Sequence, residues 1–458
     1  MFAAAAAAGP PSEIRRSAET DAALRYRLSD DDERLLNEIE HACFQFFWKE
    51  VGAPAPLVKD RYKGPVSSIA AVGFQLSALP VGVERGWVTR AQAEERALAI
   101  LDALLGHRDN KRFGVYLHYP DLNTGGLSQE GYEIVASTVD HALLVAGAMP
   151  AAVYFRGRVA ERTDQLVADT NWKAFATGPS GLLSMGWRPK DSKKIDGPGD
   201  FLDWHWWNAS DEERLVYFLA AAAPRAEHAV EPALYYRLKR SIEAHDKLPP
   251  FVVSWPGTLF TYFFSHCWID YRTLGLDDPA RFGVDAPRVD WVENSRRAVL
   301  THRQRCIDLS TRFKTLAPDR WGLSACAARD GYIVPQLQPN LTDKDELHEG
   351  TVAPYAAGSA IMFAPREAVA ALRVFRELKG HDGKPLIWRD PAAGGYGLVD
   401  SFNLDQHFAS DDYVGIDHGP LLLAIENART GLIWRLFMQH ENARRAVERL
   451  RLQPHAEP

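Results

Sequence analysis

Apolar residues recur at helical spacing through most of the chain. The first stripe runs from Leu35 to Phe47, and capping and acidic residues at 29–32 come directly before it. The same spacing predicts longer helices at 91–105, 139–154, 212–223, 292–307, 366–378 and 421–438. It also predicts shorter helices at 69–79, 162–172, 233–244 and 443–452. The chain is therefore expected to be all-α.

Long loops rich in Gly, Pro, Asp and Trp separate these helices. They lie at 107–136, 178–210, 245–260, 314–356 and 380–417. Loops of more than about 15 residues usually carry function, so these connections are the first place to look for a site. No alternation of apolar and polar residues persists long enough to predict a large sheet.

The domain organisation follows from the lack of a low-complexity linker between residues 29 and 452. We predict one domain at 29–458. The alanine-rich segment at 1–28 is expected to be a disordered leader or the remnant of a signal peptide.

Composition and charge exclude several classes of protein. The 458 residues include 53 Lys plus Arg and 60 Asp plus Glu, a net charge of −7, so no basic field attracts nucleic acid. We see no apolar run of about 18 to 20 residues and expect no membrane span. The 13 Trp beside 21 Phe and 15 Tyr are more indole than the core of such a chain needs.

Motifs for cofactors and metals are missing from the sequence. There is no GxxxxGK[ST] loop, no GxSxG elbow and no HExxH pair. The four cysteines lie far apart without a CxxC pair, which indicates neither a zinc site nor a disulfide framework. We therefore expect no cofactor and no metal.

Carboxylates stand beside aromatic residues where loops meet predicted helices. Glu133 and Asp140 flank the start of the helix at 139–154, and Asp140 could alternatively serve only as a cap. The loop before Glu212 holds Trp204, Trp206 and Trp207. Sugar rings have apolar faces and hydroxylated rims, so flat indoles with acceptors beside them suit a sugar-binding site.

Three more carboxylates occupy similar junctions, namely Glu349, Asp400 and Asp417. A closed ring of helices would bring all of these groups to one rim. Hydrolysis of a glycosidic bond needs one carboxylic acid and one carboxylate, and neighbouring acidic groups and apolar walls raise the pKa of the acid. The residues fit this chemistry better than phosphoryl, hydride or acyl transfer.

Several strings of the sequence resemble a known family. They include STVDHALLVAGAM (137–149), FSHCWIDYR (264–272), WGLSAC (321–326), TVAPYAAGS (351–359), GYGLVDSFN (395–403) and GIDHGPLLLAIENARTGLIWRLFM (415–438). With further strings, they cover almost all of residues 32–440. The chain resembles the glycoamylase-like domain and, within it, glycoside hydrolase family 144.

The resemblance implies a fold and an activity. The fold would be a single (α/α)6 barrel, a toroid of helical hairpins with long loops on the active-site face. The activity would be that of bacterial β-1,2-glucanases, which act on linear β-1,2-glucan. It also implies a periplasmic or secreted location, with the cytoplasm as the alternative because the sequence has no clear signal peptide.

Roles for individual carboxylates are carried over from the family. By this resemblance Glu212 is the general acid, Asp400 is the base that activates water, and Asp140 is a further acidic residue of the catalytic group. The mechanism implied is inverting. The family's aromatic loop differs from residues 206–212 here, where Ala209 and Asp211 replace other residues, so chain-length preference or the choice between endo and exo cutting could differ.

A larger set is expected to bind substrate. Its members are aromatic or polar residues from the strings and junctions above: Glu133, Trp204, Trp206, Trp207, His266, Trp268, Asp270, Arg272, Trp321, Glu349 and Asp417.

Endo-acting hydrolysis of β-1,2-glucan is the leading hypothesis, and three alternatives stay open. An exo-acting enzyme that releases sophorose and a β-1,2-glucan transglycosylase would use the same scaffold. A protein that binds glycans without catalysis is the third. The expected partner is an oligosaccharide or polysaccharide, and the sequence does not predict an oligomeric state.

Overall fold

The computed structural model describes residues 12–455 apart from 129, 131, 256, 338 and 340–346. The helices of this part are α1 (Ala18–Leu24), α2 (Asp30–Lys49), α3 (Ile69–Glu84), α4 (Arg90–Gly106), α5 (Thr138–Phe155), α6 (Gly157–Asp169), α7 (Asp211–Ala221), α8 (Ala233–Arg237), α9 (Trp291–Asp308), α10 (Pro354–Ser359), α11 (Pro365–Glu377), α12 (Gly415–Arg429), α13 (Leu432–Gln439) and α14 (Glu441–Arg449). The chain is mostly helical, as predicted.

Within the described residues, short strands form small ladders in the loops and no extended sheet. They are β1 (Glu13–Ile14), β2 (Lys111–Arg112), β3 (Val115–Tyr116), β4 (Ala136–Ser137), β5 (Gly186–Pro189), β6 (Gly199–Phe201), β7 (Ile242–Glu243), β8 (Phe251–Val252), β9 (Arg288–Val289), β10 (Cys326–Ala328), β11 (Gly331–Ile333), β12 (Trp388–Arg389), β13 (Gly397–Leu398), β14 (Phe402–Asn403) and β15 (Phe408–Ala409). Antiparallel pairing joins β4, β5 and β6 into one ladder, and β10 pairs with β11.

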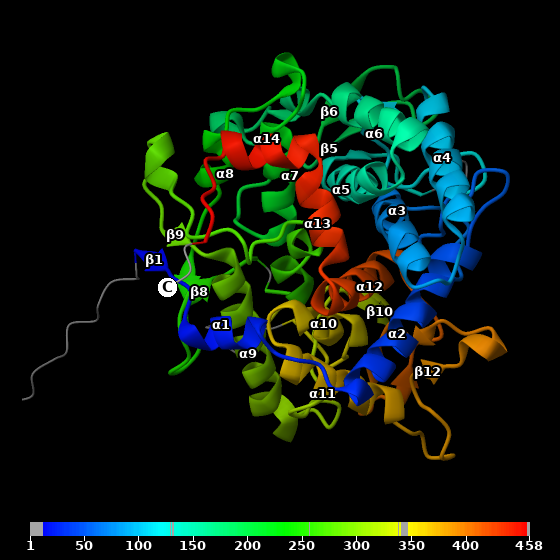
Figure 1. The fold of residues 1–458 in the computed structure, drawn as a ribbon, viewed down its shortest axis with the longest axis vertical. Helices are drawn as coiled ribbons and strands as arrows, with labels where there is room; N and C mark the ends of the chain where they lie inside the picture. Colours follow the sequence, from blue (N-terminus) through cyan, green and yellow to red (C-terminus); the bar gives the residue numbers. More distant parts are fainter. Residues whose placement is uncertain are drawn as a thin grey trace, which may run out of the picture.

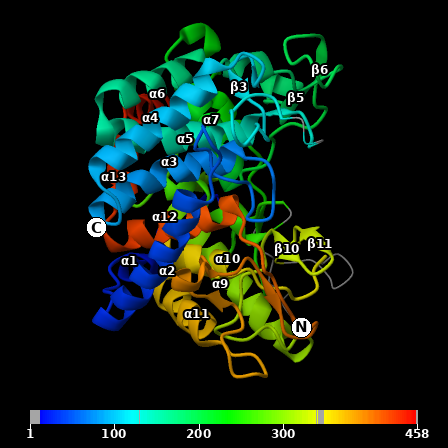
Figure 2. The ribbon, with the colours of Figure 1, turned by 90° about the vertical axis from the view of Figure 1, so that its right-hand side faces the viewer.

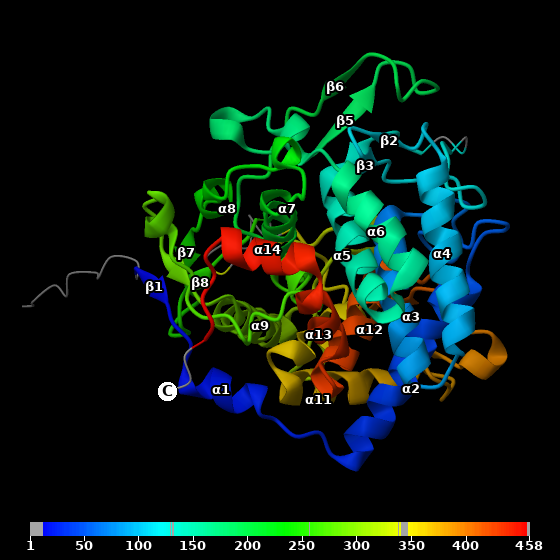
Figure 3. The same ribbon diagram turned by 45° about the horizontal axis from the view of Figure 1, so that its top comes forward.

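The helices form a double ring (Figure 1). The inner segments are α3, α5, α7, two 3-10 turns at Leu259–Tyr262 and Ser265–Cys267, α10 and α12, each packed on the next. Phe263 after the first turn contacts Tyr355 of α10, with ring centroids 6.2 Å apart, on the side where the inner segments are shortest. Helices such as α4 and α6 lie outside this ring (Figure 3). The architecture is the predicted (α/α)6 barrel.

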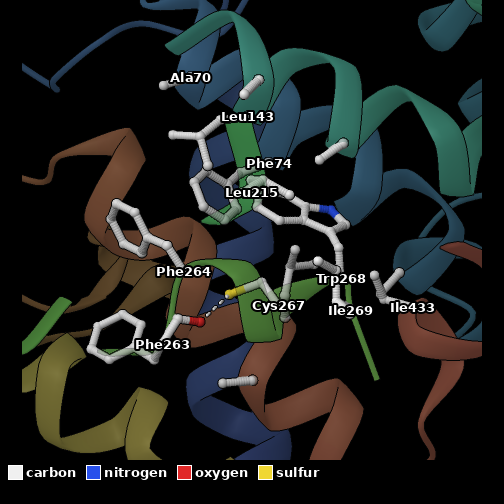
Figure 4. Packing of buried hydrophobic residues seen from close by; sticks show 14 of the residues in the cluster. Ala70, Phe74, Leu143, Leu215, Phe263, Phe264, Cys267, Trp268, Ile269 and Ile433 are labelled. Carbon is white, nitrogen blue, oxygen red and sulfur yellow. Dashed lines mark hydrogen bonds between the residues drawn. The ribbon is translucent and has the colours of Figure 1, made fainter. Parts of the chain in front are cut away.

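The inner helices are apolar on every side because both of their faces are covered. Helices α3 and α5 approach closely at Gly73 and Gly147, where a Cβ on Gly147 would lie 1.9 Å from the Gly73 carbonyl oxygen. In Figure 4, Phe74, Leu143 and Leu215 from α3, α5 and α7 surround the centre of the ring. A helix that is hydrophobic all round is expected in such a position.

Helix α5 corrects one expectation about membranes. Its 18 residues are long and apolar enough to cross a bilayer by length and composition, although we expected no such run. In the structure 83% of this helix is buried inside the protein. The core helix of a folded domain can have the length and composition of a membrane span, and α5 is buried as such a helix is.

Most of the predicted helices are confirmed, and two are not. The predicted helix at 421–438 is broken into α12 and α13 by Gly431, whose φ of +66° suits glycine. The predicted helix at 233–244 ends at Arg237, because the Lys239 carbonyl accepts a hydrogen bond from the Ala209 N–H and the chain then enters β7.

The segment before the barrel is ordered over its described part, contrary to the predicted disordered leader. Strand β1 pairs in parallel with β9, and the guanidinium of Arg16 lies 2.9 Å from the Asp290 carboxylate. Both side chains of this ion pair are buried. Residues 1–11 of the predicted leader lie outside the described residues.

One end of the ring carries the hairpins. Strands β3, β5, β6, β10 and β11 all lie on the same side of the helices, and α13 lies on the other side (Figure 2). This hairpin side is where the first turns of α5, α7 and α12 carry acidic residues.

Candidate active site

Glu212 lies in the first turn of α7, whose N-terminus is capped by Ser210 through a hydrogen bond from the Glu213 N–H. Its side chain is half-buried, and no hydrogen bond to its carboxyl occurs within the described residues. Burial raises the pKa of Glu212 to about 8, and the charge of Asp140 adds to this shift. A helix N-terminus favours an ionised carboxylate, but the effect is about 1 kcal/mol or less, so burial and the neighbouring charge dominate.

Asp140 lies in the first turn of α5 and does not cap it. The cap position is Ser137, whose side chain accepts no capping hydrogen bond from a main-chain N–H of the helix. Instead the Ser137 hydroxyl donates to Asp140 Oδ2 at 2.5 Å. Asp140 Oδ1 lies 3.4 Å from Nε2 of His118, and the Asp140 side chain is buried. The alternative reading of Asp140 as a mere helix cap is therefore wrong.

His118 sits between two of the predicted carboxylates. Its Nδ1 lies 3.8 Å from Glu133 Oε1, opposite the contact with Asp140. Burial disfavours the imidazolium, but Asp140, Glu133 and Asp60 outweigh burial and raise the pKa of His118. The contact with His118 lowers the pKa of Glu133, which is exposed and lines a cavity of about 520 Å³.

Asp400 and Asp417 form a buried carboxyl pair. Asp400 Oδ2 accepts a hydrogen bond of 2.6 Å from the Ala327 N–H of β10. Burial raises the pKa of Asp400 to about 6, while a hydrogen bond from Asp417 lowers it. Burial and the charge of Asp400 raise the pKa of Asp417 well above its usual range. Of the two carboxyls, Asp417 therefore holds its proton more tightly and is the donor in the hydrogen bond between them.

Asp60 links the two groups of carboxylates. Its main-chain carbonyl accepts a hydrogen bond of 2.7 Å from the Gly415 N–H at the start of α12. Burial raises the pKa of Asp60. The guanidinium of Arg61 lies 3.2 Å from the Asp60 carboxylate and acts in the opposite direction. The charge of Asp60 acts on Asp417 as well as on His118. We call Asp60, His118, Asp140, Glu212, Asp400 and Asp417 the acidic cluster.

One indole ring, that of Trp206, contacts the start of α5, and exposed indoles lie in the same loop and in the loop against it. Trp206 is half-buried, and its Nε1–H donates to the Thr138 hydroxyl at 2.8 Å. Trp204 and Trp207 are exposed by 74% and 43%. Trp255 is 64% exposed, and its main-chain N–H donates to the Asn208 side chain at 3.4 Å, so its loop lies against the Trp207 loop. These rings could stack on sugars.

Glu349 lies near the Asp400 side of the cluster. Its carboxylate accepts a hydrogen bond of 2.8 Å from the Thr351 hydroxyl, and its main-chain carbonyl accepts one from Asn403 beside β14. Burial and the nearby charges of Asp400, Asp417 and Glu349 all raise the pKa of the Cys326 thiol. Glu349 is half-buried, and its role in binding substrate stays a prediction.

Three residues predicted to bind substrate are in the core instead. Trp268 and Trp321 have no exposed surface, and the Trp268 indole donates to Ser77 at 2.9 Å in the middle of the ring (Figure 4). His266 is 2% exposed, and its Nε2 lies 3.0 Å from the Ser295 hydroxyl. Their strings are rich in aromatic residues because they build the inner ring, and no surface of Trp268 or Trp321 is free to touch a sugar.

Asp270 and Arg272 lie at the other end of the ring. They bind each other at 2.8 Å, and the Arg272 guanidinium stacks on Trp434 of α13, 3.7 Å from the ring centroid. The Arg272 carbonyl accepts a hydrogen bond from Arg16 of the N-terminal segment. Because α13 lies opposite the hairpins, this pair fastens the N-terminal segment and does not join the acidic cluster (Figure 2).

Within the described residues, no group of three or more His, Cys, Asp or Glu side chains is arranged to hold a metal ion. A reaction without a cofactor or metal remains a prediction from the sequence.

The sequence reasoning missed Asp60, Arg61, His118, Tyr332 and Trp255. Tyr332 on β11 is 46% exposed, and Arg61 lies over its ring, 5.6 Å from the centroid. These residues lie in loops between helices, where no spacing marks them. His118, Trp255 and Tyr332 did lie in the long loops at 107–136, 245–260 and 314–356, whose length alone indicated function.

The fold and the acidic cluster place the chain in the class of (α/α)6 barrels with a carboxylate-rich end. The family model described as "Putative glucoamylase" matches residues 204–441, a little over half of the chain. The chain belongs to this glycoamylase-like family.

Comparisons with individual proteins agree with this family. An exo β-1,2-glucooligosaccharide sophorohydrolase (non-reducing end) from Parabacteroides distasonis is 26% identical over 94% of this chain. The chain spans only 59% of that relative's length.

Solved structures share the fold over nearly the whole chain. A putative glucoamylase from Bacteroides uniformis has a TM-score of 0.77 at 25% identity, covering 94% of this chain and 99% of that one. An endo-β-1,2-glucanase from Chitinophaga pinensis, in complex with sophorotriose and glucose, has a TM-score of 0.77 at 24% identity, with coverages of 93% and 99%.

Proposed function

We propose that this protein is a glycoside hydrolase that cuts β-1,2-glucan, with Glu212 as general acid and Asp400 as the base that activates water. The observation that carries the proposal is the different setting of these two carboxyls: Glu212 is half-buried without a hydrogen bond among the described residues, whereas Asp400 is buried and accepts a hydrogen bond from the Ala327 N–H. A pKa of about 8 keeps Glu212 protonated, and a pKa of about 6 leaves Asp400 ionised. Acid–base hydrolysis needs this pairing of one acid and one carboxylate.

The hydrogen bonds around the base support its role. The Ala327 N–H and the Asp417 carboxyl both donate to Asp400 and hold it in one orientation. Nothing comparable binds Glu212 in the described part of the chain, so its proton is free to reach the leaving oxygen of a substrate. Water activated by Asp400 would attack from the opposite face of the sugar, which inverts the anomeric carbon.

The choice of substrate rests on the relatives and on the indoles. The Parabacteroides relative acts on β-1,2-glucooligosaccharides, and the Chitinophaga neighbour is an endo-β-1,2-glucanase. Exposed Trp204, Trp207 and Trp255 offer flat surfaces for a neutral glucan. Endo cutting is our first proposal. Release of sophorose from the non-reducing end is the second, because the curated relative that the chain matches has that activity.

The test is incubation with linear β-1,2-glucan followed by chromatography of the products. A ladder of oligosaccharides supports endo cutting, sophorose alone supports exo cutting, and cyclic or longer chains indicate a transglycosylase. Linear β-1,3-glucan and α-1,4-glucan serve as matched controls and are expected to stay intact. Binding of β-1,2-glucan with no product would instead make the protein a glycan-binding module.

A periplasmic or secreted location belongs to the same proposal and is supported by the resemblance of the sequence alone. Fractionation of the host with an antibody against the protein tests it. Recovery with the cytoplasmic fraction would contradict it.

A further inference from the structure

Both oxygens of the Asp140 carboxylate face a partner. The Ser137 hydroxyl donates to Oδ2 at 2.5 Å, and Nε2 of His118 lies 3.4 Å from Oδ1. Ser137 ends β4 in the ladder with β5, so its position is set by main-chain pairing. The carboxylate is 7% exposed and is held from two sides.

His118 is itself fixed by its surroundings. Its main-chain N–H donates to Val135 at 2.9 Å, and its carbonyl accepts from the Ile69 N–H at 3.1 Å. Its ring stacks on Tyr119 with centroids 3.7 Å apart. The imidazole therefore cannot follow Asp140 if that carboxylate moves, and it acts as a stationary partner.

We propose that His118 and Ser137 are positioning residues that hold the Asp140 carboxylate in one orientation near the start of α7, so that Asp140 serves the Glu212 acid by its fixed position and not by transferring a proton. This inference rests on the proposed function, in which Glu212 is the acid. It assigns Asp140 an electrostatic role in place of proton transfer. A carboxylate engaged on both oxygens is poorly placed to activate water, whereas its charge can still act on a neighbouring carboxyl.

Asp140 and His118 are surrounded by other charged groups. Asp140 faces His118, Glu212 and Asp60. His118 also faces Glu133 and Asp60.

Two cations stand behind these partners. Arg188 acts on Glu133, and Arg61 binds Asp60 at 3.2 Å. Since both cations act on other carboxylates, His118 is the positive group that directly contacts Asp140. If Asp140 loses its charge or turns away, Glu212 binds its proton less tightly.

The test is the alkaline limb of the pH profile of kcat/KM for β-1,2-glucan, which reports loss of the proton from the acid. Asp140→Asn is expected to move this limb to lower pH by about one unit. Ser137→Ala removes no charge and is expected to move it in the same direction by less. His118→Asn also removes a positive group beside Asp140, so its expected effect is a lower kcat/KM at the optimum and not a limb at lower pH. An alkaline limb that stays in place or moves to higher pH in Ser137→Ala would overturn the proposal.

The matched control is His107→Asn. Its imidazole also faces a carboxylate, with Nδ1 3.4 Å from Asp109, but this pair follows α4 and lies outside the acidic cluster. The control is expected to leave the limb unchanged. Thermal unfolding of every variant identifies any that fails to fold. If His118→Asn or Asp140→Asn does not fold, Ser137→Ala, which removes only one hydroxyl, still tests the proposal.

A second measurement separates this inference from the proposed function. The carbonyl stretch of protonated Glu212, identified in infrared difference spectra by its loss in Glu212→Gln, is titrated without substrate. Disappearance of the band at lower pH in Ser137→Ala than in the wild type supports the positioning role, even if β-1,2-glucan is not cut. A band that titrates identically in the wild type and Ser137→Ala removes the positioning role, even if the glucan is cut.

Discussion

The indole N–H of Trp206 donates a 2.8 Å hydrogen bond to the hydroxyl of Thr138, the first residue of α5. This bond ties the loop before α7 to the start of α5. Glu212 lies one residue into α7, and Asp140 lies two residues into α5, so the same contact sets how the acid meets its charged neighbour. It joins parts of the chain that are 68 residues apart.

Trp206→Phe keeps the aromatic ring and removes this donor. We expect kcat/KM on β-1,2-glucan to fall about tenfold, because small displacements of catalytic groups cost rate. The free energy of unfolding should fall by only about 1 kcal/mol, the usual contribution of one hydrogen bond. The control is Trp48→Phe on α2, where the change should leave kcat/KM unaltered. Equal activity of the Trp206 variant and the wild type would mean that the bond does not position the acid.

The proton states of Asp400 and Glu212 predict a bell-shaped pH profile of kcat/KM. Asp400 must be ionised, so activity falls below its raised pKa of about 6. Glu212 must be protonated, so activity falls above its raised pKa of about 8. The profile should have its optimum between these values, and Asp400→Asn should lose at least about 100-fold in kcat. A profile that stays flat from pH 5 to 9, values on either side of about 6 and 8, would count against both assignments.

Asp417 offers a sharper test of the carboxyl pair. Because it donates its proton to Asp400, Asp417→Asn keeps a donor at this position, whereas Asp417→Ala removes it. We expect the Asn variant to retain a larger part of kcat than the Ala variant. The acid limb of the Ala variant should move to higher pH, because the hydrogen bond that lowers the pKa of Asp400 is lost. Equal acid limbs in the two variants would show that the pair does not share a proton.

A buried tryptophan, Trp268, and an exposed one, Trp255, are expected to differ in what their substitution by alanine changes. Trp268→Ala should lower the free energy of unfolding by about 3–5 kcal/mol, since the ring is fully buried. Trp255→Ala, at an exposed position, should leave stability unchanged and raise KM for β-1,2-glucan about fivefold through loss of stacking. Chemical denaturation and steady-state kinetics measure both. A KM effect at Trp268 with no loss of stability would contradict its place in the core.

Much of the fold was predictable because the sequence pattern that marks a helix lies within the helix itself. Apolar spacing and the capping box of Ser29 and Asp32 marked helices such as α2 closely. The inner segment at Leu259–Cys267 gave no such signal, since it consists of two 3-10 turns with bulky aromatic residues. His266 in this segment and Trp268 directly after it therefore looked like binding residues, although they fill the centre of the ring.

The site was predictable in part for the same reason. Asp140, Glu212 and Asp417 lie in the first turns of helices, so a ring of helices brings them to one end. Asp60 and His118 reach the cluster through long-range main-chain contacts, such as Gly415 N–H to the Asp60 carbonyl. Contacts of this kind leave no pattern in the sequence.

Glu212→Gln tests the central claim most directly. The matched control is Glu227→Gln, at an exposed position in the turn Ala226–His228. Turnover of linear β-1,2-glucan should fall by about 10³-fold or more in Glu212→Gln, while calorimetry with sophorose should show unchanged binding. The control should match the wild type in both. Turnover by Glu212→Gln within about tenfold of the wild type would contradict Glu212 as the general acid.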